Sequence, residues 1–459
     1  MRNHILSLLS LLSALVLLPA TGRSQLSLSY EKYTLPNGLQ IILHEDHTLP
    51  LVSVNTYYHV GSGHEKPGRT GFAHLFEHLM FEGSANVPEG KFDECLEAAG
   101  GNNNGSTNTD RTNYYQDAPS NALELAIFLE ADRMGGLLAT MSLATVDGQR
   151  DVVKNERRQS YENRPYGMAD ITLSEKLFPP EHPYHWPTIG SMADLSAASY
   201  EDVVEFFRTY YAPNNASVVI AGDIDPAKTR ELVTKWFGPI PEGKPVPPID
   251  PPVAFLPAEK RSVMEDKVQL PRLYMCWLTP AAFRPGDAEM DLVAGVLTGG
   301  KNSRLYKRLV YEMQIAQDVS AGQGSQALAS YFEIQATAKA GHTLAEIEKV
   351  IQEEIDRLKT TPPDARELAR TVNGYESSFL ARLQVVGGFG GKADILNNYY
   401  TRTGNPDYLN EDFSRYKAIS PVDITAAVQQ FLRDDGRVIL SVVPEGKPEL
   451  ASPAKGGVK

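Results

Sequence analysis

A proline-dense segment constrains this chain more than any other feature, because it divides the sequence into two parts. Residues 238–257 read GPIPEGKPVPPIDPPVAFLP. Proline lacks an amide hydrogen and fixes φ, so this density of proline interrupts helices and sheet ladders and produces an extended linker. With the linker at 239–258, the 459 residues divide into an N-terminal half, 25–238, and a C-terminal half, 259–459. Each half has the size of an ordinary domain.

The two halves show similar patterns of secondary structure. A hairpin at 33–43, turning at Asn37-Gly38, opens the first half. Each half then has a strand, an apolar helix, a long helical stretch and a late strand, at 51–58, 71–84, 120–138 and 216–221 in the first half and at 272–279, 288–297, 342–359 and 437–443 in the second. This mixture predicts an α+β fold of two homologous α/β-roll halves, each a mostly antiparallel sheet covered on one face by helices.

The apolar helix of the first half, GFAHLFEHLMFEGS, carries three polar side chains. His74 and His78 are four residues apart and share one face of a helix, with Glu77 beside them. Burying these groups without compensation is costly. Two imidazoles at this spacing can each offer a nitrogen to one divalent ion, and zinc favours such ligands. The order H-x-x-E-H inverts the better-known zinc-peptidase helix and predicts a metal site; histidines satisfied within the core are the alternative.

The second half lacks both histidines. When the halves are superposed on Tyr57 and Tyr274, His74 falls on Asp291 and His78 on Gly295. A duplicated fold that keeps a polar cluster in only one copy does not need that cluster for folding. The comparison of the halves therefore favours a functional role for the histidines.

A hydrolytic zinc site needs a third protein ligand and leaves the fourth position to water. Glu156, in DVVKNERR at 151–158, is the candidate. On a helix, Val152 and Val153 lie four and three residues before it and place it on the inward side, with Arg157 and Arg158 turned elsewhere. From spacing alone, an ordinary ion pair between Glu156 and a basic neighbour is slightly favoured.

Charge and cysteine content exclude other classes of function. The net charge is −13, and nucleic-acid binding needs clustered lysine and arginine, so nucleic acid is not expected as a partner. Such a charge mainly serves solubility. Cys95 and Cys276 are the two cysteines, which make neither a disulfide framework nor a cysteine-based zinc site. We expect two buried free thiols, with a single bridge between them as the alternative.

The first 24 residues have the layout of a secretory signal peptide. Arg2 precedes an apolar run at 5–18, and small residues follow at about 20–24. The run is shorter than the roughly 20 residues that a membrane-spanning helix needs, and no cysteine follows it to carry a lipid. We therefore expect an exported, periplasmic protein with no membrane anchor in its mature form.

Together these blocks of sequence resemble the pitrilysin/insulinase clan of zinc metallopeptidases, in its short processing-peptidase-like branch. The similarity covers essentially the whole mature chain, including GSGHEKPGRTGFAHLFEHLMFEGS, LEADRM, VVKNERRQ, HPYHWPTIG and YYAPNNASVVIAGDID. It implies one Zn²⁺ per chain held by His74, His78 and Glu156, with Glu77 as general base in peptide hydrolysis. It also implies unfolded peptides as substrates, enclosed in a chamber between two halves.

The stretch NNNGSTNTDRTNYYQDAP at 102–119 reads as two strands, 102–107 and 112–115, joined by a polar turn. By resemblance, the first is the edge strand to which an extended peptide substrate adds through backbone hydrogen bonds. Asn104, Gly105, Ser106 and Thr107 match that segment. Taken alone, a polar strand of this kind also fits a plain loop or edge.

The second half departs from the family pattern. The stretch SRLY at 303–306 resembles a block after which self-sufficient members carry an arginine and, seven residues later, a tyrosine that contact the substrate. Those positions are Val310 and Gln317 here. Arg304 and Tyr311 have the same spacing, but Arg304 belongs to the earlier block. The exported branch resembles paired systems in which one subunit holds the zinc and a metal-free relative supplies the arginine and tyrosine. By this resemblance we expect the metal-bearing subunit of a heterodimer, with a homologous metal-free subunit supplying the Arg/Tyr pair. A homodimer that tolerates the loss and a non-catalytic peptide-binding or structural protein are the alternatives.

Overall fold

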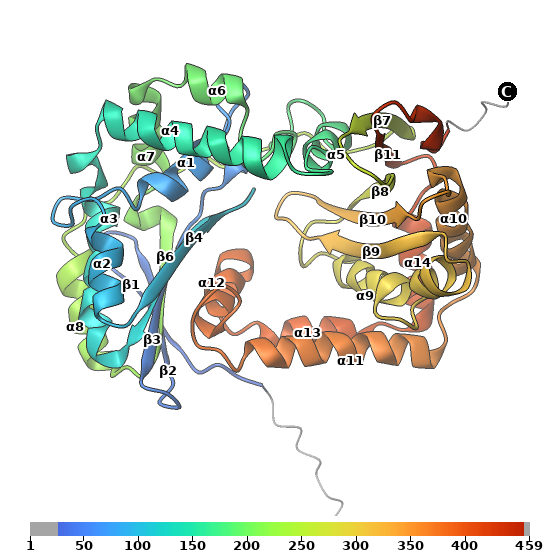
Figure 1. The fold of residues 1–459 in the computed structure, drawn as a ribbon. Helices are drawn as coiled ribbons and strands as arrows, with labels where there is room; N and C mark the ends of the chain where they lie inside the picture. The colour runs from blue at the N-terminus through green and yellow to red at the C-terminus, as the bar shows by residue number, and fades with distance from the viewer. Residues whose placement is uncertain (1–25, 454–459) are drawn as a thin grey trace, which may run out of the picture.

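The computed structural model describes residues 26–453. The signal peptide expected at 1–24 lies outside this range. The two halves of the chain lie side by side, each built on its own sheet (Figure 1). In the described part of the chain, no helix combines the length and apolar character needed to cross a bilayer.

The N-terminal half contains a six-stranded sheet with the order β1-β2-β6-β3-β5-β4. Neighbouring strands are antiparallel except for β2 and β6, which run parallel. The predicted hairpin is confirmed as β1 and β2, and β4 closes the sheet with a strand partner on one side only within the described residues. The strands are β1 (Glu31–Thr34), β2 (Gln40–Glu45), β3 (Leu51–Tyr58), β4 (Asn102–Thr107), β5 (Thr112–Pro119) and β6 (Ala216–Gly222).

The C-terminal half repeats this topology. Its sheet has the order β7-β11-β8-β10-β9, which matches β2-β6-β3-β5-β4 strand for strand, and its parallel pair, β7 and β11, matches β2 and β6. The expected α+β fold of two related, mostly antiparallel halves is therefore confirmed. The strands are β7 (Lys260–Asp266), β8 (Arg272–Thr279), β9 (Ala316–Gly324), β10 (Ser330–Ala338) and β11 (Arg437–Pro444).

Helices cover the sheets. Those of the N-terminal half are α1 (Phe72–Leu79), α2 (Lys91–Ala98), α3 (Leu123–Thr140), α4 (Leu143–Arg157), α5 (Ala169–Leu177), α6 (Met192–Ala197), α7 (Tyr200–Tyr210) and α8 (Pro226–Phe237). Those of the C-terminal half are α9 (Asp287–Thr298), α10 (Leu344–Thr360), α11 (Ala365–Arg382), α12 (Lys392–Thr403), α13 (Leu409–Ala418) and α14 (Pro421–Phe431).

Both faces of each sheet are covered, which corrects the expectation of helices on one face. Along β6, Val218 and Ile220 join the core made with helices of the same half, whereas Val219 and Ala221 join a separate cluster with α12 of the other half. The alternation follows from the two-residue period of a strand. Because both faces are apolar, β6 is buried along its whole length.

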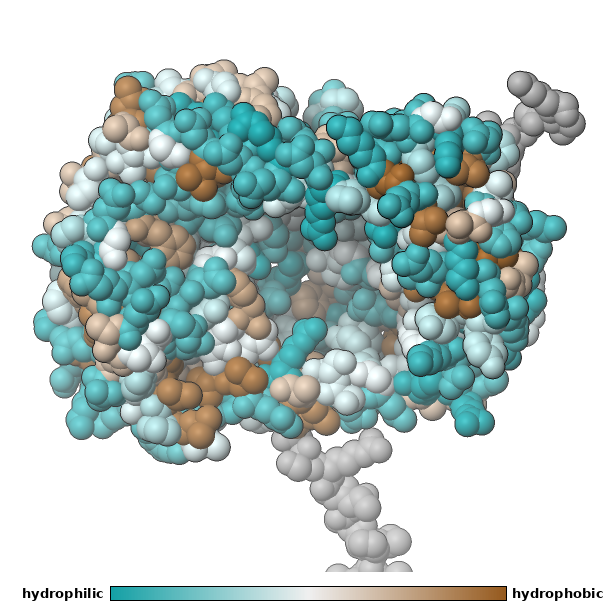
Figure 2. Space-filling model, in the orientation of Figure 1, coloured by the Kyte–Doolittle hydropathy of each residue, from teal (hydrophilic) through white to brown (hydrophobic). Residues whose placement is uncertain are grey.

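The two halves exchange one helix each. α12 of the C-terminal half packs on β3 and β6, and α5 of the N-terminal half packs on β8 and β11. Figure 1 shows α5 beside the C-terminal sheet and α12 beside the N-terminal one. Leu173 and Leu177 of α5 share an apolar cluster with Val438 and Leu440 of β11. This exchange places the free edge of β4 next to the C-terminal half, and the space-filling view shows a hollow between the halves (Figure 2).

Residues 239–258 of the expected linker contain neither helix nor strand. Of the two cysteines, Cys276 is buried on β8, but Cys95 is exposed on α2, and both are free. The expectation of two buried thiols was therefore wrong for Cys95. The short helix α2 buries only Phe92 and Leu96, so the residues between them face solvent.

Candidate metal centre

α1 carries the histidines and is held in place by its apolar side chains and by a carboxylate. Leu75, Phe76 and Leu79 are fully buried, and the helix packs against α4 and β4. An eight-residue helix has little intrinsic stability, so this packing decides its position. At its N-terminus the Glu65 carboxylate accepts hydrogen bonds from the Gly71 and Ala73 amides at 2.9 and 2.8 Å.

The structure brings His74, His78 and Glu156 together. Nε2 of His74 lies 3.6 Å from Glu156 Oε2, and Nε2 of His78 lies 3.4 Å from the same oxygen. One ligand atom from each of the three residues lies within 4.8 Å of the others. A tetrahedral ion held at about 2.1 Å from its ligands separates them by about 3.4 Å. The observed spacings fit that geometry and exceed the roughly 2.7–3.2 Å of a direct hydrogen bond.

The electrostatics of the three groups also suit a cation. Burial lowers the pKa of His74, which favours its neutral, ligating form. The neighbouring His78 imidazole lowers the pKa of Glu156, which favours the carboxylate. Nδ1 of His74 is buried without a hydrogen-bond partner among the described residues. When His74 is neutral and its Nε2 lone pair faces the carboxylate oxygen of Glu156, the two acceptors repel each other. A metal ion between them attracts both and makes the arrangement favourable.

Glu156 reaches the site from the last turn of α4, but not for the expected reason. Val153 is fully buried, whereas Val152 is 43% exposed and does not mark the inward side. Arg157 does not turn away: it is buried and its Nη1 donates to Gly190 O at 2.6 Å. Among the described residues the Glu156 carboxylate pairs only with the two histidines. The ordinary ion pair with lysine or arginine, the rival interpretation, is therefore absent there.

The site is open to solvent on one side. The side chain of His78 is 25% exposed and that of Glu156 is 40% exposed, whereas that of His74 is 11% exposed. The three protein atoms therefore leave room for a fourth ligand. That opening is what distinguishes a catalytic zinc site from a closed structural one.

Glu77 lies between α1 and β4, outside the group of three ligand atoms. A methyl group added at Gly105 would lie 3.2 Å from Glu77 Cγ and 3.2 Å from the ring of Tyr114. The glycine thus allows β4 to approach the glutamate closely. Tyr114 is buried and its hydroxyl donates to Phe76 O at 3.0 Å, which ties β5 to α1.

The four residues expected to bind substrate lie on β4, an edge strand, as the sequence predicted. The turn is closed by the Asn108 amide, which donates to Arg111 O at 3.0 Å. Along an antiparallel pair of strands, hydrogen-bonded and non-hydrogen-bonded residue pairs alternate. Since this pair is hydrogen-bonded, the register makes Ser106 and Asn104 the residues whose backbone groups bond β5. The backbone groups of Gly105 and Thr107 therefore face the free edge. The Gly105 amide donates to the side-chain oxygen Oδ1 of Asn104 at 2.8 Å.

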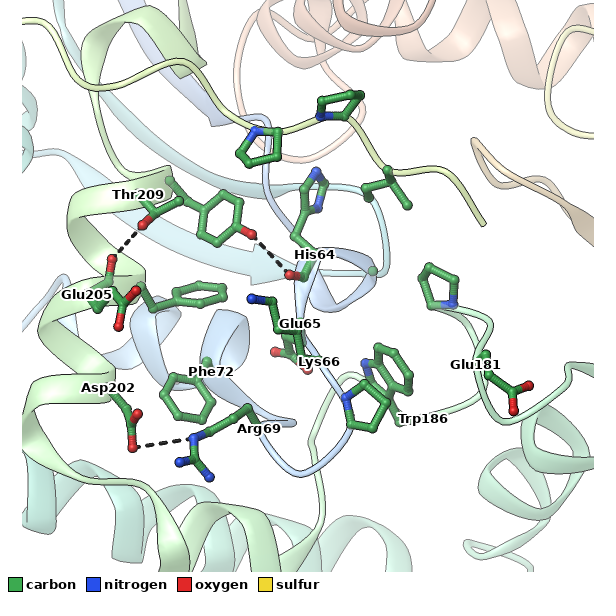
Figure 3. Close-up of a pocket in the computed structure, with 18 residues that line it drawn as sticks. His64, Glu65, Lys66, Arg69, Phe72, Glu181, Trp186, Asp202, Glu205 and Thr209 are labelled. Atoms are coloured by element: carbon green, nitrogen blue, oxygen red, sulfur yellow. Dashed lines mark hydrogen bonds and ion pairs between the residues drawn. The ribbon is translucent and has the colours of Figure 1, made fainter. Parts of the chain in front are cut away.

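Two positioning residues escaped the sequence analysis, Glu65 and Arg157. Glu65 lines a cavity of about 680 Å³ beside the N-terminus of α1. Figure 3 shows Phe72 and the ion pair of Arg69 with Asp202, which is 3.3 Å long, in the same cavity. Burial raises the pKa of Glu65 to about 8 despite its backbone hydrogen bonds. Glu65 lies in a loop rich in glycine and proline, where no periodic pattern indicates which side chains point inward. The one signal in the sequence was its position shortly before the helix.

The second half contains no equivalent of the histidines in α9. Both α1 and α9 begin after a glycine in the left-handed region, Gly71 with φ 93° and Gly286 with φ 100°. Aligning these starts puts Glu289 at the position of His74 and Val293 at that of His78. The register differs by two residues from the superposition made on sequence.

The positions that lack the Arg/Tyr pair lie on the C-terminal half. Val310 is in a π-helical turn, Tyr306–Glu312, and Gln317 is exposed on β9. Arg304 forms a two-pronged ion pair with Glu367, both contacts at 2.8 Å. Tyr311 is 74% exposed. Arg304 is therefore engaged in packing α11, which agrees with its assignment to the earlier sequence block.

Two family models match the chain. The model described as Insulinase (Peptidase family M16) matches residues 40–176, and the model described as Peptidase M16 inactive domain matches residues 197–375. The chain is 30% identical over 380 residues to a protein of Helicobacter pylori named zinc protease PqqE, covering 80% of this chain and 84% of the relative.

Solved structures show the same fold. The crystal structure of a protease from Helicobacter pylori matches with a TM-score of 0.82 at 25% identity, covering 91% of this chain and all of the other. The first half of the periplasmic protease PqqL from Escherichia coli matches with a TM-score of 0.76 at 18% identity, covering 92% and 93% of the two chains.

Proposed function

Because the chain belongs to the M16 (insulinase) peptidase family, we propose that it is a zinc-dependent endopeptidase that hydrolyses unfolded peptides. The observation that carries the proposal is the arrangement of His74, His78 and Glu156, whose spacings fit a tetrahedral ion with an open fourth position. The name of the Helicobacter pylori relative, a zinc protease, supports zinc as the ion. One zinc per chain follows, since the second half carries no such group among its described residues.

The chain's own residues have distinct tasks in the proposed reaction. When bound, zinc supplies Lewis-acid chemistry that lowers the pKa of water and polarises a peptide carbonyl. Glu77 takes a proton from the attacking water and returns it to the nitrogen of the departing amine. β4 accepts the substrate as an added strand through the backbone groups of Gly105 and Thr107. The close approach of Gly105 to Glu77 sets the scissile bond beside the base.

We further infer that this chain works as the metal-bearing subunit of a heterodimer, with a homologous metal-free subunit supplying the missing Arg/Tyr pair. The residues at the two positions, Val310 and Gln317, cannot donate charged hydrogen bonds to a substrate. Arg304 cannot replace the arginine without breaking its ion pair with Glu367. Comparing peptidase activity with and without such a relative tests this: full activity of the chain alone contradicts it.

The proposed location is the periplasm. The signal-like sequence at 1–24 supports export. One of the proteins of similar fold is named a periplasmic protease. Fusing residues 1–24 to a reporter that is active only after export tests the proposal, and a reporter that stays inactive refutes it.

The peptidase proposal is tested on purified protein, with its partner subunit where one is found. We expect one equivalent of zinc, cleavage of an unstructured peptide, and loss of cleavage on chelation. Glu77→Gln should lower kcat by about 10²- to 10⁴-fold while zinc is retained. Glu97→Gln, an exposed glutamate on α2, is the matched control and should cleave normally. Cleavage that survives chelation, or a fully active Glu77→Gln variant, refutes the proposal.

A further inference from the structure

A cavity of about 360 Å³ lies where the two halves meet, beside the turn that follows β4. Both halves contribute to it. The N-terminal half supplies the turn between β4 and β5, and the C-terminal half supplies α12 and the loop before α9. Its charged lining residues are Asp110, Arg111, Arg284 and Arg402. We call it the arginine cavity.

The arginine cavity carries more positive than negative charge. Three guanidinium groups and one carboxylate, that of Asp110, line the cavity, in a protein whose net charge is −13. A second carboxylate, that of Asp394, lies behind the lining residue Tyr57, whose hydroxyl donates to it at 2.7 Å. Asp110 is already shared, since it accepts from the Tyr184 hydroxyl and from the Ala327 amide at 2.9 Å. A strongly acidic protein that gathers three arginines at one cavity creates a local site for an anion.

Two of the arginines have unused donors. Arg402 donates through Nε to Asn398 at 2.9 Å and through Nη2 to Asp110 at 3.3 Å, but its Nη1 is buried without a partner among the described residues. Arg284 is exposed, and no ion pair ties it to an acidic side chain in the described part of the chain. A buried donor without a partner is costly and favours an incoming acceptor.

The loop that carries Arg284 is fixed rather than loose. Phe283, beside it, has φ 62°, a left-handed conformation that non-glycine residues rarely adopt. Its amide donates to Asp287 Oδ2 at 2.8 Å, which holds the loop in that conformation. Strained backbone of this kind clusters at binding sites. The arginine is therefore presented from a defined position.

The cavity adjoins the strand proposed to bind substrate. Nη1 of Arg111 donates to Ser106 O at 2.8 Å, and Ser106 follows Gly105, the residue that approaches Glu77. A peptide extended along β4 advances about 3.3 Å per residue. Arg111 of the cavity pairs with Asn108, three residues beyond Gly105, so a group about three residues from the bond beside Glu77 lies level with the cavity.

We propose that the arginine cavity binds a carboxylate of the peptide substrate, a few residues from the cleaved bond. The proposal rests on the proposed peptidase function and names a substrate feature for it. Arginine suits this task because its planar fork pairs with both oxygens of a carboxylate. The carboxylate comes either from an aspartate or glutamate side chain or from the C-terminus of the peptide.

The test measures binding, so it does not depend on hydrolysis. Full-length mature protein carrying Glu77→Gln, supplemented with zinc, is titrated into fluorescein-labelled unstructured peptides. One series carries glutamate or glutamine at a single position that is moved along the peptide; a second series ends in a free acid or an amide. Fluorescence anisotropy gives the Kd of each peptide.

We expect glutamate at one position, or the free acid, to bind at least about tenfold tighter than its neutral counterpart. The arm that shows the preference identifies the source of the carboxylate. Arg284→Gln together with Arg402→Gln should abolish the preference. Arg284→Gln alone, an exposed change, should reduce it without affecting the fold. Arg208→Gln, an exposed arginine on α7, removes the same charge and should keep it.

Two results overturn the inference: no acid preference in either series, or an undiminished preference in the double variant. Failure of the proposed peptidase function is separate, because it shows as absent zinc and absent hydrolysis in the protein with Glu77 intact. An acid preference without hydrolysis still supports the cavity as a carboxylate site. Hydrolysis without an acid preference removes this inference alone.

Discussion

Asn397 on α12 fastens the C-terminal half to the N-terminal sheet, and its replacement by alanine should loosen that attachment. Its Nδ2 donates to Asn55 O at 3.0 Å, to Asn55 Oδ1 at 2.9 Å and to Ser217 O at 3.2 Å, and its Oδ1 accepts from the Ser217 hydroxyl. All three residues are fully buried. Water therefore cannot replace the lost partners without opening the contact between α12 and the sheet.

The magnitude follows from the groups left behind. Asn397→Ala removes the partner of Asn55 Oδ1, whereas the Ser217 hydroxyl keeps His59 Nε2 as a partner at 3.0 Å. Leaving the buried Asn55 Oδ1 without a partner costs about 1–3 kcal/mol. The shortened side chain also leaves a small cavity, which adds to the loss. Since a domain is stable by about 5–15 kcal/mol, the variant should lose a measurable fraction of its unfolding free energy.

Urea unfolding followed by circular dichroism measures this loss, and hydrogen exchange should show faster exchange in β3 and β6. Asn398→Ala is the matched control on the same helix, because Asn398 is exposed and accepts only from Arg402 among the described residues. Its effect should stay within about 0.5 kcal/mol. An Asn397→Ala protein with the wild-type midpoint, or equal losses in the two variants, refutes the reasoning.

Two further changes test the site and its counterpart in the second half. Gly105→Ala puts a methyl group 3.2 Å from Glu77 Cγ. Since carbon atoms in contact prefer a separation of about 3.5–4.0 Å, either Glu77 or β4 must shift. We therefore expect kcat/KM to fall by about 10- to 100-fold with zinc content unchanged. Loss of zinc, or normal cleavage, contradicts this. Burial raises the pKa of Asp291 to about 7, so the folded protein holds a proton that the unfolded chain releases, and stability falls as pH rises from about 4 to 7. Asp291→Asn keeps an acceptor for the Tyr416 hydroxyl and should reduce the loss of unfolding free energy between pH 5 and pH 8 by on the order of 3 kcal/mol. Denaturant unfolding at these two pH values measures the loss. A variant with the wild-type pH dependence contradicts the prediction.

Much of the fold was predictable because its signals are local. The apolar and aromatic runs at 51–58 and 272–279 coincide with β3 and β8. Asn37-Gly38 marked the first hairpin, and the polar strand at 102–107 is an edge strand. The spacing of His74 and His78 placed both imidazoles on one side of α1, where the structure finds them beside Glu156.

What the sequence did not reveal depends on packing between distant segments. Leu173 and Leu177 show that α5 has an apolar stripe, but not that the stripe covers the sheet of the other half. The sequence assigns the inward face of α4 from Val152 and Val153, of which Val153 is buried and Val152 is exposed. Its buried residues are Val146, Val153 and Arg157, and an arginine that bonds a backbone carbonyl carries no hydrophobic signal. The roles of the metal ligands and of Glu77 remain predictions.

The most direct test of the account is the coordination of zinc itself. X-ray absorption and anomalous diffraction on zinc-loaded protein should show one zinc bound by Nε2 of His74 and of His78 and by a carboxylate oxygen of Glu156, at about 2.0–2.2 Å. Glu156→Gln should lose that oxygen and bind zinc more weakly. Zinc-saturated protein with no metal between these three side chains would contradict the account.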